Sequence, residues 1–111
     1  MSKFSNFKDS LLDDLKDPNY AKTYLSVALE EYENSKDTLS FLTALRDVAE
    51  ANGGLTQLAS KTHLNRQNLY RALSSKGNPR FDTIETVLHG LGYRLAVVPV
   101  NETIFYEPLE R

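Results

Sequence analysis

The residues that most constrain the fold of this chain form one window, residues 55–74, in which two short helical patterns flank a tight turn. Two helices that cross at close range need a small residue at the crossing point, and Ala59 supplies it. Apolar residues occupy the places where such a pair buries its contacts: Leu58, Leu64, Leu69, and Ala72 or Leu73. This spacing predicts a helix-turn-helix whose second helix runs over about residues 65–73.

The turn of this unit contains His63, at a place where glycine is the commonest residue. A tight connection of this kind uses the left-handed backbone conformation, in which φ is positive. Histidine is among the residues enriched at positive φ. We therefore expect the turn to form, at some cost in backbone strain.

The second helix of the window leaves hydrogen-bonding side chains on its outer face. Arginine contacts guanine, and asparagine and glutamine contact adenine, so these are the residue types that read base edges in DNA. We predict base contacts from Asn65, Arg66, Gln67, Asn68, Tyr70 and Arg71. We predict phosphate contacts from Thr56, Gln57, Ser74, Lys76, Asn78 and Arg80. The alternative is a pair of core helices whose basic face is merely solvated, and for Lys76 simple solvation explains the residue nearly as well.

The net charge of the chain is −2, but the charges are unevenly distributed. Residues 55–94 contain six lysines and arginines against two acidic residues, whereas residues 1–54 contain ten acidic residues against six basic ones. No aspartate or glutamate lies between residues 55 and 81. A basic region within an acidic chain indicates nucleic-acid binding there and a different partner for the front half.

Helical periodicity extends on both sides of the window. It predicts helices near residues 4–15, 18–32, 38–51 and 81–91, with Asp17 and Asp37 as amino-terminal caps. The tyrosines of the second of these helices, Tyr20, Tyr24 and Tyr32, are interpreted as core residues. We divide the chain into an N-terminal arm and helix (residues 1–36), a helix-turn-helix domain (37–100) and a tail (101–111).

Residues 93–98 are rich in β-branched and aromatic residues and predict a single strand. The expected fold is therefore mainly α, a five-helix domain with an N-terminal helical extension and a C-terminal β-strand. No second strand is predicted, and an unpaired strand edge tends to pair with a strand of another chain. We expect a homodimer with Tyr93, Leu95 and Val97 at its contact, since most such DNA readers bind two half-sites about 34 Å apart.

Several other classes of protein are disfavoured. The absence of cysteine excludes disulfides and Cys-ligated zinc and fits a reducing compartment. His63 and His89 have no third ligand at metal-binding spacing, so we expect no metal, no other cofactor and no small-molecule substrate. No nucleophile elbow, phosphate loop or paired-carboxylate motif stands out, so we expect no enzyme. No signal peptide or apolar run of membrane-spanning length is evident, so we expect a cytoplasmic protein without membrane contact.

Seven segments of the sequence carry a family resemblance: residues 17–21 (DPNYA), 24–25 (YL), 28–31 (ALEE), 41–49 (FLTALRDVA), 53–59 (GGLTQLA), 68–74 (NLYRALS) and 77–79 (GNP). In these, and over about residues 7–98 as a whole, the chain resembles the addiction-module antidote family. The family members that it resembles are HigA-type antitoxins with an Xre/Cro-like helix-turn-helix domain. His63 departs from the commoner glycine, which affects the turn geometry and the operator preference.

The resemblance implies an antitoxin that neutralises a RelE/HigB-like ribonuclease toxin and, bound to double-stranded operator DNA, represses its own operon. An acidic front half with an apolar stripe suits a basic toxin as partner, so residues 1–36 are the candidate toxin-contacting part. A stand-alone phage-type Xre repressor without a toxin is the nearest alternative. A protein-interaction module with a vestigial helix-turn-helix is a further one.

Overall fold

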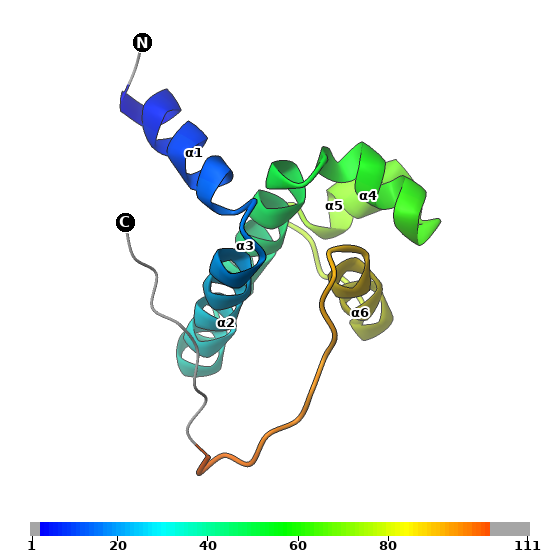
Figure 1. Ribbon diagram of the computed structural model, residues 1–111. Coiled ribbons are helices and arrows are strands. Elements are labelled where there is room, and N and C mark those ends of the chain that lie inside the picture. The colour runs from blue at the N-terminus through cyan, green and yellow to red at the C-terminus, as the bar shows by residue number, and fades with distance from the viewer. Residues whose placement is uncertain (1–2, 103–111) are drawn as a thin grey trace.

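The computed structural model describes residues 3–102, with side chains from Phe7 onward. Within this range the chain forms six helices (Figure 1). They are α1 (Lys3–Asp14), α2 (Pro18–Ser35), α3 (Thr38–Ala51), α4 (Gly54–Thr62), α5 (Arg66–Ala72) and α6 (Phe81–Gly90). None of the helices in this part of the chain is both long enough and apolar enough to cross a membrane.

The caps at the start of α2 and α3 are those that the sequence predicts. The Asp17 side chain accepts a hydrogen bond from the Asn19 amide at 2.9 Å, and Pro18 opens α2, where a missing N–H costs nothing. Asp37 accepts hydrogen bonds from the amide of Ser40 at 3.3 Å and from its hydroxyl at 2.6 Å. The hydroxyl bond is the main reason why the pKa of Asp37 lies below its usual value.

The hydrophobic core is organised around α3, which packs against α1, α2 and α4. Its apolar stripe is buried almost completely, and residues from every other helix or its flanks complete the core. The side chains with the least exposure are Leu15, Leu42, Leu45, Val48, Leu69, Leu73 and Val87. Because these residues come from separate stretches of chain, burial of one common core holds the helices in place.

A polar network fastens α1 and α2 to α3. The Tyr24 hydroxyl donates a hydrogen bond of 2.8 Å to the buried Asp47 carboxylate, and Lys8 of α1 lies 3.7 Å from both Asp47 and Glu50. Burial, followed by the Asp47 contact, raises the pKa of Tyr24 well above its ordinary value. The N-terminal end of α1 projects away from the other helices (Figure 1). Phe7, in this helix, is 73% exposed.

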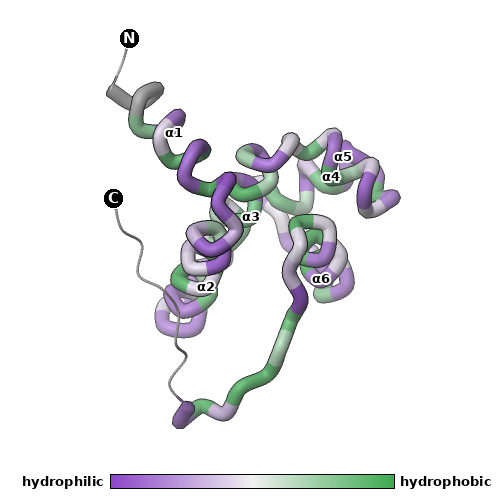
Figure 2. Tube along the Cα trace, viewed as in Figure 1, coloured by the Kyte–Doolittle hydropathy of each residue, from purple (hydrophilic) through white to green (hydrophobic). Residues whose placement is uncertain are grey.

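The prediction of a C-terminal strand is wrong. In the described residues 93–102 the chain runs in an extended but irregular path after α6, and no strand or sheet occurs between residues 3 and 102 (Figure 1). The segment is strongly apolar (Figure 2), yet Val97 is 98% exposed. The physical reason is that β-branched residues favour strands when they pack on a pleated surface, and here no neighbouring strand offers one.

Candidate nucleic-acid interface

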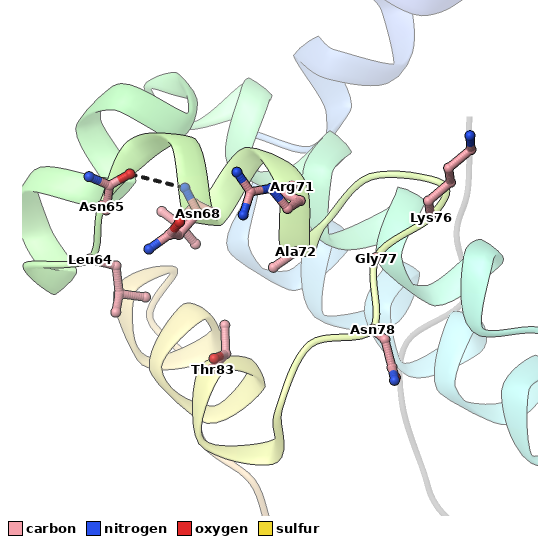
Figure 3. Close-up of a pocket in the computed structure, with 10 residues that line it drawn as sticks. Leu64, Asn65, Asn68, Arg71, Ala72, Lys76, Gly77, Asn78 and Thr83 are labelled. Carbon is pink, nitrogen blue, oxygen red and sulfur yellow. Dashed lines mark hydrogen bonds between the residues drawn. The ribbon is translucent and has the colours of Figure 1, made fainter.

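The segment that joins α4 to α5 is three residues long and ends one helix while it begins the next. His63 follows the last residue of α4 with φ 61° and ψ 20°, so the left-handed turn is formed with a histidine. Asn65 then caps α5, and its side-chain oxygen accepts a hydrogen bond from the Asn68 amide at 3.1 Å (Figure 3). The two helices are therefore tightly coupled in position.

The inner side of this α4–α5 unit is packed as the sequence predicts. Leu58, Ala59, Leu69 and Leu73 are buried, and Leu64 and Ala72 are partly buried. Helix α6 supports the unit through Gly90, where an added Cβ would lie 2.6 Å from side-chain carbons of Leu58 and Thr62. The small residue allows α6 to approach α4 closely, which fixes α4 on the core.

The residues predicted to read bases lie together on the outer surface of α5. Arg66, Gln67, Asn68, Tyr70 and Arg71 are all exposed, as is the cap residue Asn65. Arg66 also donates a hydrogen bond from Nε to the Thr56 hydroxyl at 2.7 Å, which ties α5 to the first turn of α4. This bond holds the guanidinium of Arg66 in place through Nε alone, and the two terminal nitrogens of the guanidinium take no part in it.

Four of the six residues predicted to contact phosphate lie at two places on this surface. Lys76 and Asn78 line a cavity of about 380 Å³ together with Asn65, Asn68 and Arg71 (Figure 3). Thr56 and Gln57 are exposed in the first turn of α4.

The other two residues of the phosphate prediction have partners within the chain. The Ser74 hydroxyl donates to the Arg71 carbonyl at 2.7 Å. Arg80 forms an ion pair of 3.3 Å with Asp82 and does not line the cavity. The structure therefore brings Lys76 and Asn78, but not Arg80, beside the predicted base-reading residues.

The charge on this surface has one sign. Residues 54–78 contain Lys61, Arg66, Arg71 and Lys76 and no acidic residue, and all four of these cations are exposed. Side chains that combine positive charge with amide and hydroxyl groups can bind a polyanion and also discriminate between its hydrogen-bonding groups. No group of three or more histidine, aspartate or glutamate residues suited to a metal ion occurs among the described residues.

The three residues predicted at a dimer contact have different environments. The Tyr93 hydroxyl donates to the Pro18 carbonyl at 3.0 Å, and burial raises its pKa, helped by the charge of Asp17. Leu95 lines a cavity together with residues of α2 and is partly exposed, and Val97 is almost fully exposed. Tyr93 and Leu95 line one cavity beside α2, and the strand on which the dimer prediction was based is absent from the described residues. The dimer contact itself stays a prediction.

Sequence reasoning missed two features that the structure shows. One is the Tyr24–Asp47 bond, whose only signal in the sequence is a charged residue inside the apolar stripe of α3. The other is an apolar groove beside α6, whose residues come from four separate segments. No local pattern reveals either one, because both depend on how distant segments meet.

Comparison with known proteins assigns the chain to a family. A family described as "probable addiction module antidote protein" matches residues 4–99. A Haemophilus influenzae protein described as an uncharacterized protein is 39% identical over 56 residues, which are 50% of this chain and 57% of that relative. No solved structure matches the chain significantly. Because the family match spans nearly the whole sequence, the chain belongs to the addiction-module antidote family.

Proposed function

We propose that the protein is an antitoxin that neutralises a RelE-like ribonuclease toxin, and that its α4–α5 unit is a helix-turn-helix through which it binds its operator and represses its own operon. Membership of an addiction-module antidote family supports the antitoxin role. The RelE-like, or HigB-like, class of toxin is proposed from the resemblance to HigA-type antitoxins. A neutralising protein of this kind acts by binding, so it requires no catalytic group of its own.

The observation that carries the DNA-binding part is the outer surface of α5. It presents five exposed hydrogen-bonding side chains, and no acidic residue lies nearby in sequence from residue 51 to residue 81. In this proposal Arg66, Gln67, Asn68, Tyr70 and Arg71 enter the major groove and contact base edges. The first turn of α4 and the loop with Lys76 and Asn78 hold the phosphates on either side.

We further propose that two copies bind the operator around a two-fold axis. A single recognition helix reads only a few base pairs, and helix-turn-helix proteins commonly double their contact by dimerisation. Light scattering at micromolar concentration tests this. A mass of 12.6 kDa, that of one chain, for the DNA-free protein, and one chain per operator in the complex, would contradict it.

Operator binding is tested by a gel shift with the DNA upstream of the protein's own gene. Arg71→Ala removes one base contact, worth roughly 1–3 kcal/mol, so we expect affinity to fall about tenfold. Lys22→Ala, which removes an exposed cation on α2, is the matched control and should have little effect. Undiminished affinity of the Arg71 variant at about 0.15 M salt would refute the assignment.

Neutralisation is tested by expressing the reading frame that adjoins the gene, alone and together with this protein. We expect growth arrest from the neighbour alone and normal growth when both are present. Rescue by the Arg71→Ala variant should equal that of the wild type, because neutralisation does not require DNA. Failure of the wild-type protein to rescue growth would count against the antitoxin role.

A further inference from the structure

An apolar groove lies on a different side of α6 from the cavity of the α4–α5 unit. It has a volume of about 420 Å³, which is in the range of protein binding pockets, roughly 300–1,000 Å³. Its apolar lining comes from four segments that are distant in sequence: Leu29, Tyr32, Phe41, Phe81, Ile84 and Leu95. The groove is thus formed by the fold as a whole.

The apolar side chains at this groove are unusually exposed. Phe81 is 76% exposed at the start of α6, and Leu29 and Tyr32 are also exposed large apolar residues. Single exposed apolar residues are common on soluble proteins, but several around one concavity are typical of an interaction site. The feature that needs explanation is therefore what covers Phe81 and its neighbours.

The charge around the groove is the opposite of the charge on α5. Residues 29–42 and 78–85, which supply all of its lining except Leu95, contain six acidic residues and two basic ones, and Arg94 beside Leu95 adds a third basic residue. Arg80 pairs with Asp82 at 3.3 Å, so these two charges offset each other, and Lys36 Nζ lies 5.4 Å from the centre of the Tyr32 ring; an excess of acidic residues remains. An acidic surround of this kind repels phosphate and attracts a cationic protein.

We infer that this groove is the docking site for the toxin, and that the toxin fills it with an amphipathic, cationic segment. Large apolar side chains of that segment lie against Phe81, Leu29 and Tyr32, while its lysines and arginines face the surrounding glutamates. Helices with one apolar face bind grooves in this way. The inference rests on the proposed antitoxin function and gives the partner a specific surface.

A second copy of this chain fits the groove less well. In a two-fold dimer the same surface meets itself, so the two acidic surrounds would be brought together. DNA is disfavoured for the same electrostatic reason. The α1 helix is the competing site for the toxin, because Phe7 is nearly as exposed as Phe81 and the acidic front half begins there.

The decisive experiment compares two identical substitutions at similarly exposed phenylalanines. Affinity for the toxin from the adjoining reading frame is measured by titration calorimetry with the full-length chain carrying Phe81→Ala or Phe7→Ala. We expect Phe81→Ala to weaken binding by about tenfold or more, as loss of a central aromatic contact does, and Phe7→Ala to change it less than about threefold. Circular dichroism and the gel shift should show both variants folded and bound to operator as the wild type is.

A second variant tests the charge argument independently. Glu33→Lys with Glu85→Lys reverses two charges, each one helical turn beyond an exposed apolar residue of the groove, Leu29 or Phe81. We expect it to slow association with the toxin by about tenfold at low salt, with a smaller difference at high salt. Unchanged association at low salt would contradict the cationic character assigned to the toxin segment.

Three results would overturn the inference. Wild-type affinity of Phe81→Ala for the toxin would exclude the groove, and a loss confined to Phe7→Ala would assign the toxin to α1. A change from dimer to monomer in Phe81→Ala, with toxin affinity kept, would assign the groove to a second copy. In each case the wild-type protein still neutralises the toxin, whereas failure of the proposed function would appear as no binding by the wild type at all.

Discussion

Two surfaces of this small protein contrast in shape and charge. The outer surface of α5 is the face of a helix, polar and purely basic, with Arg66, Gln67 and Arg71 exposed. The groove beside Phe81 is concave and mainly apolar, and the segments that line it are rich in acidic residues. A polyanion is attracted to the first and repelled by the second, whereas a cationic protein has the opposite preference. In the proposed function, DNA and toxin therefore use largely separate sets of side chains on one small helical core, with Asn78 next to both.

The two surfaces are separated by a single loop, residues 73–80. Asn78 lines both the cavity next to α5 and the apolar groove, and Pro79 lies on the groove side. The loop turns at Gly77, whose amide donates to the Ser74 carbonyl at 2.9 Å. The independence of the two surfaces therefore depends on this loop staying in place.

Gly77→Ala is expected to disturb both surfaces at once, and it has the largest predicted effect on the protein. An added Cβ would lie 2.6 Å from the backbone carbonyl carbon of Ala72, which belongs to α5 and cannot easily move. We expect the free energy of unfolding to fall by about 1–3 kcal/mol and both operator and toxin affinity to decrease. Thermal denaturation and the two binding assays measure this.

Ser75→Ala is the control for the loop, because Ser75 is exposed two residues earlier. It should leave stability and both affinities close to those of the wild type. A Gly77→Ala variant with normal binding to both partners would show that the loop adjusts freely. Neither surface would then depend on the conformation of this loop.

The sequence predicts the α5 surface well for a physical reason. Its residues are contiguous, and helical periodicity predicts which of them point inward. In agreement with it, Leu69 and Leu73 are buried, while Arg66 and Arg71 are exposed. Helix caps are equally local: Asp17 and Asp37 each bond within three residues. Features that neighbouring residues decide are therefore predictable from the amino-acid sequence alone.

The groove and the segment after α6 were not predictable in this way. Leu29, Phe41, Phe81 and Leu95 meet only because α2, α3 and α6 pack as they do, and none of their spacings indicates this. The strand prediction was wrong because strand preference depends on a neighbouring strand, which local composition cannot supply. Both errors arise where tertiary contacts, and not local pattern, decide the outcome.

Tyr24→Phe tests whether the two surfaces depend on the polar network that joins α1 and α2 to α3. It removes the hydrogen bond to the buried Asp47 carboxylate, so we expect a loss of about 1–2 kcal/mol in the free energy of unfolding. Neither surface contains Tyr24, so both affinities should be unchanged at a temperature where the variant is folded. A selective loss of one affinity would show that the network also positions that surface.

The wild type and Tyr24→Phe also allow a test of how the contribution of Tyr24 to the free energy of unfolding depends on pH. The pKa of Tyr24 is raised in the folded state, mainly by burial and then by Asp47, so the folded protein favours the neutral phenol. That contribution to stability is complete below the unfolded pKa, about 10, and is lost as the pH rises further. Urea unfolding at pH 7 and above pH 10 should therefore show a smaller gap between wild type and Tyr24→Phe at the higher pH.

Substitutions of Asn65 sharpen the assignment of the α5 surface. The Asn65 side chain caps α5, so Asn65→Ala should lower the free energy of unfolding by about 1 kcal/mol. Aspartate caps a helix as well as asparagine does, so Asn65→Asp should keep wild-type stability. It nevertheless adds a negative charge to the predicted DNA surface and should weaken operator binding severalfold. Equal operator affinity of Asn65→Asp and wild type would place Asn65 outside the contact with DNA.

The smallest predicted effect concerns the turn that sets α5 on α4. His63 adopts φ 61°, a left-handed conformation that strains a residue with a Cβ, whereas glycine adopts it freely. Relief of strain is partly offset by the greater freedom of glycine in the unfolded chain, so we expect His63→Gly to stabilise the protein by about 0.5 kcal/mol. Chemical denaturation measures this, and His63→Val, which is branched at Cβ, should be destabilised in the same experiment. Neither substitution adds charge, so any change in operator affinity should reflect a change in the geometry of the turn. If His63→Gly were less stable than the wild type, the imidazole itself would be stabilising the turn.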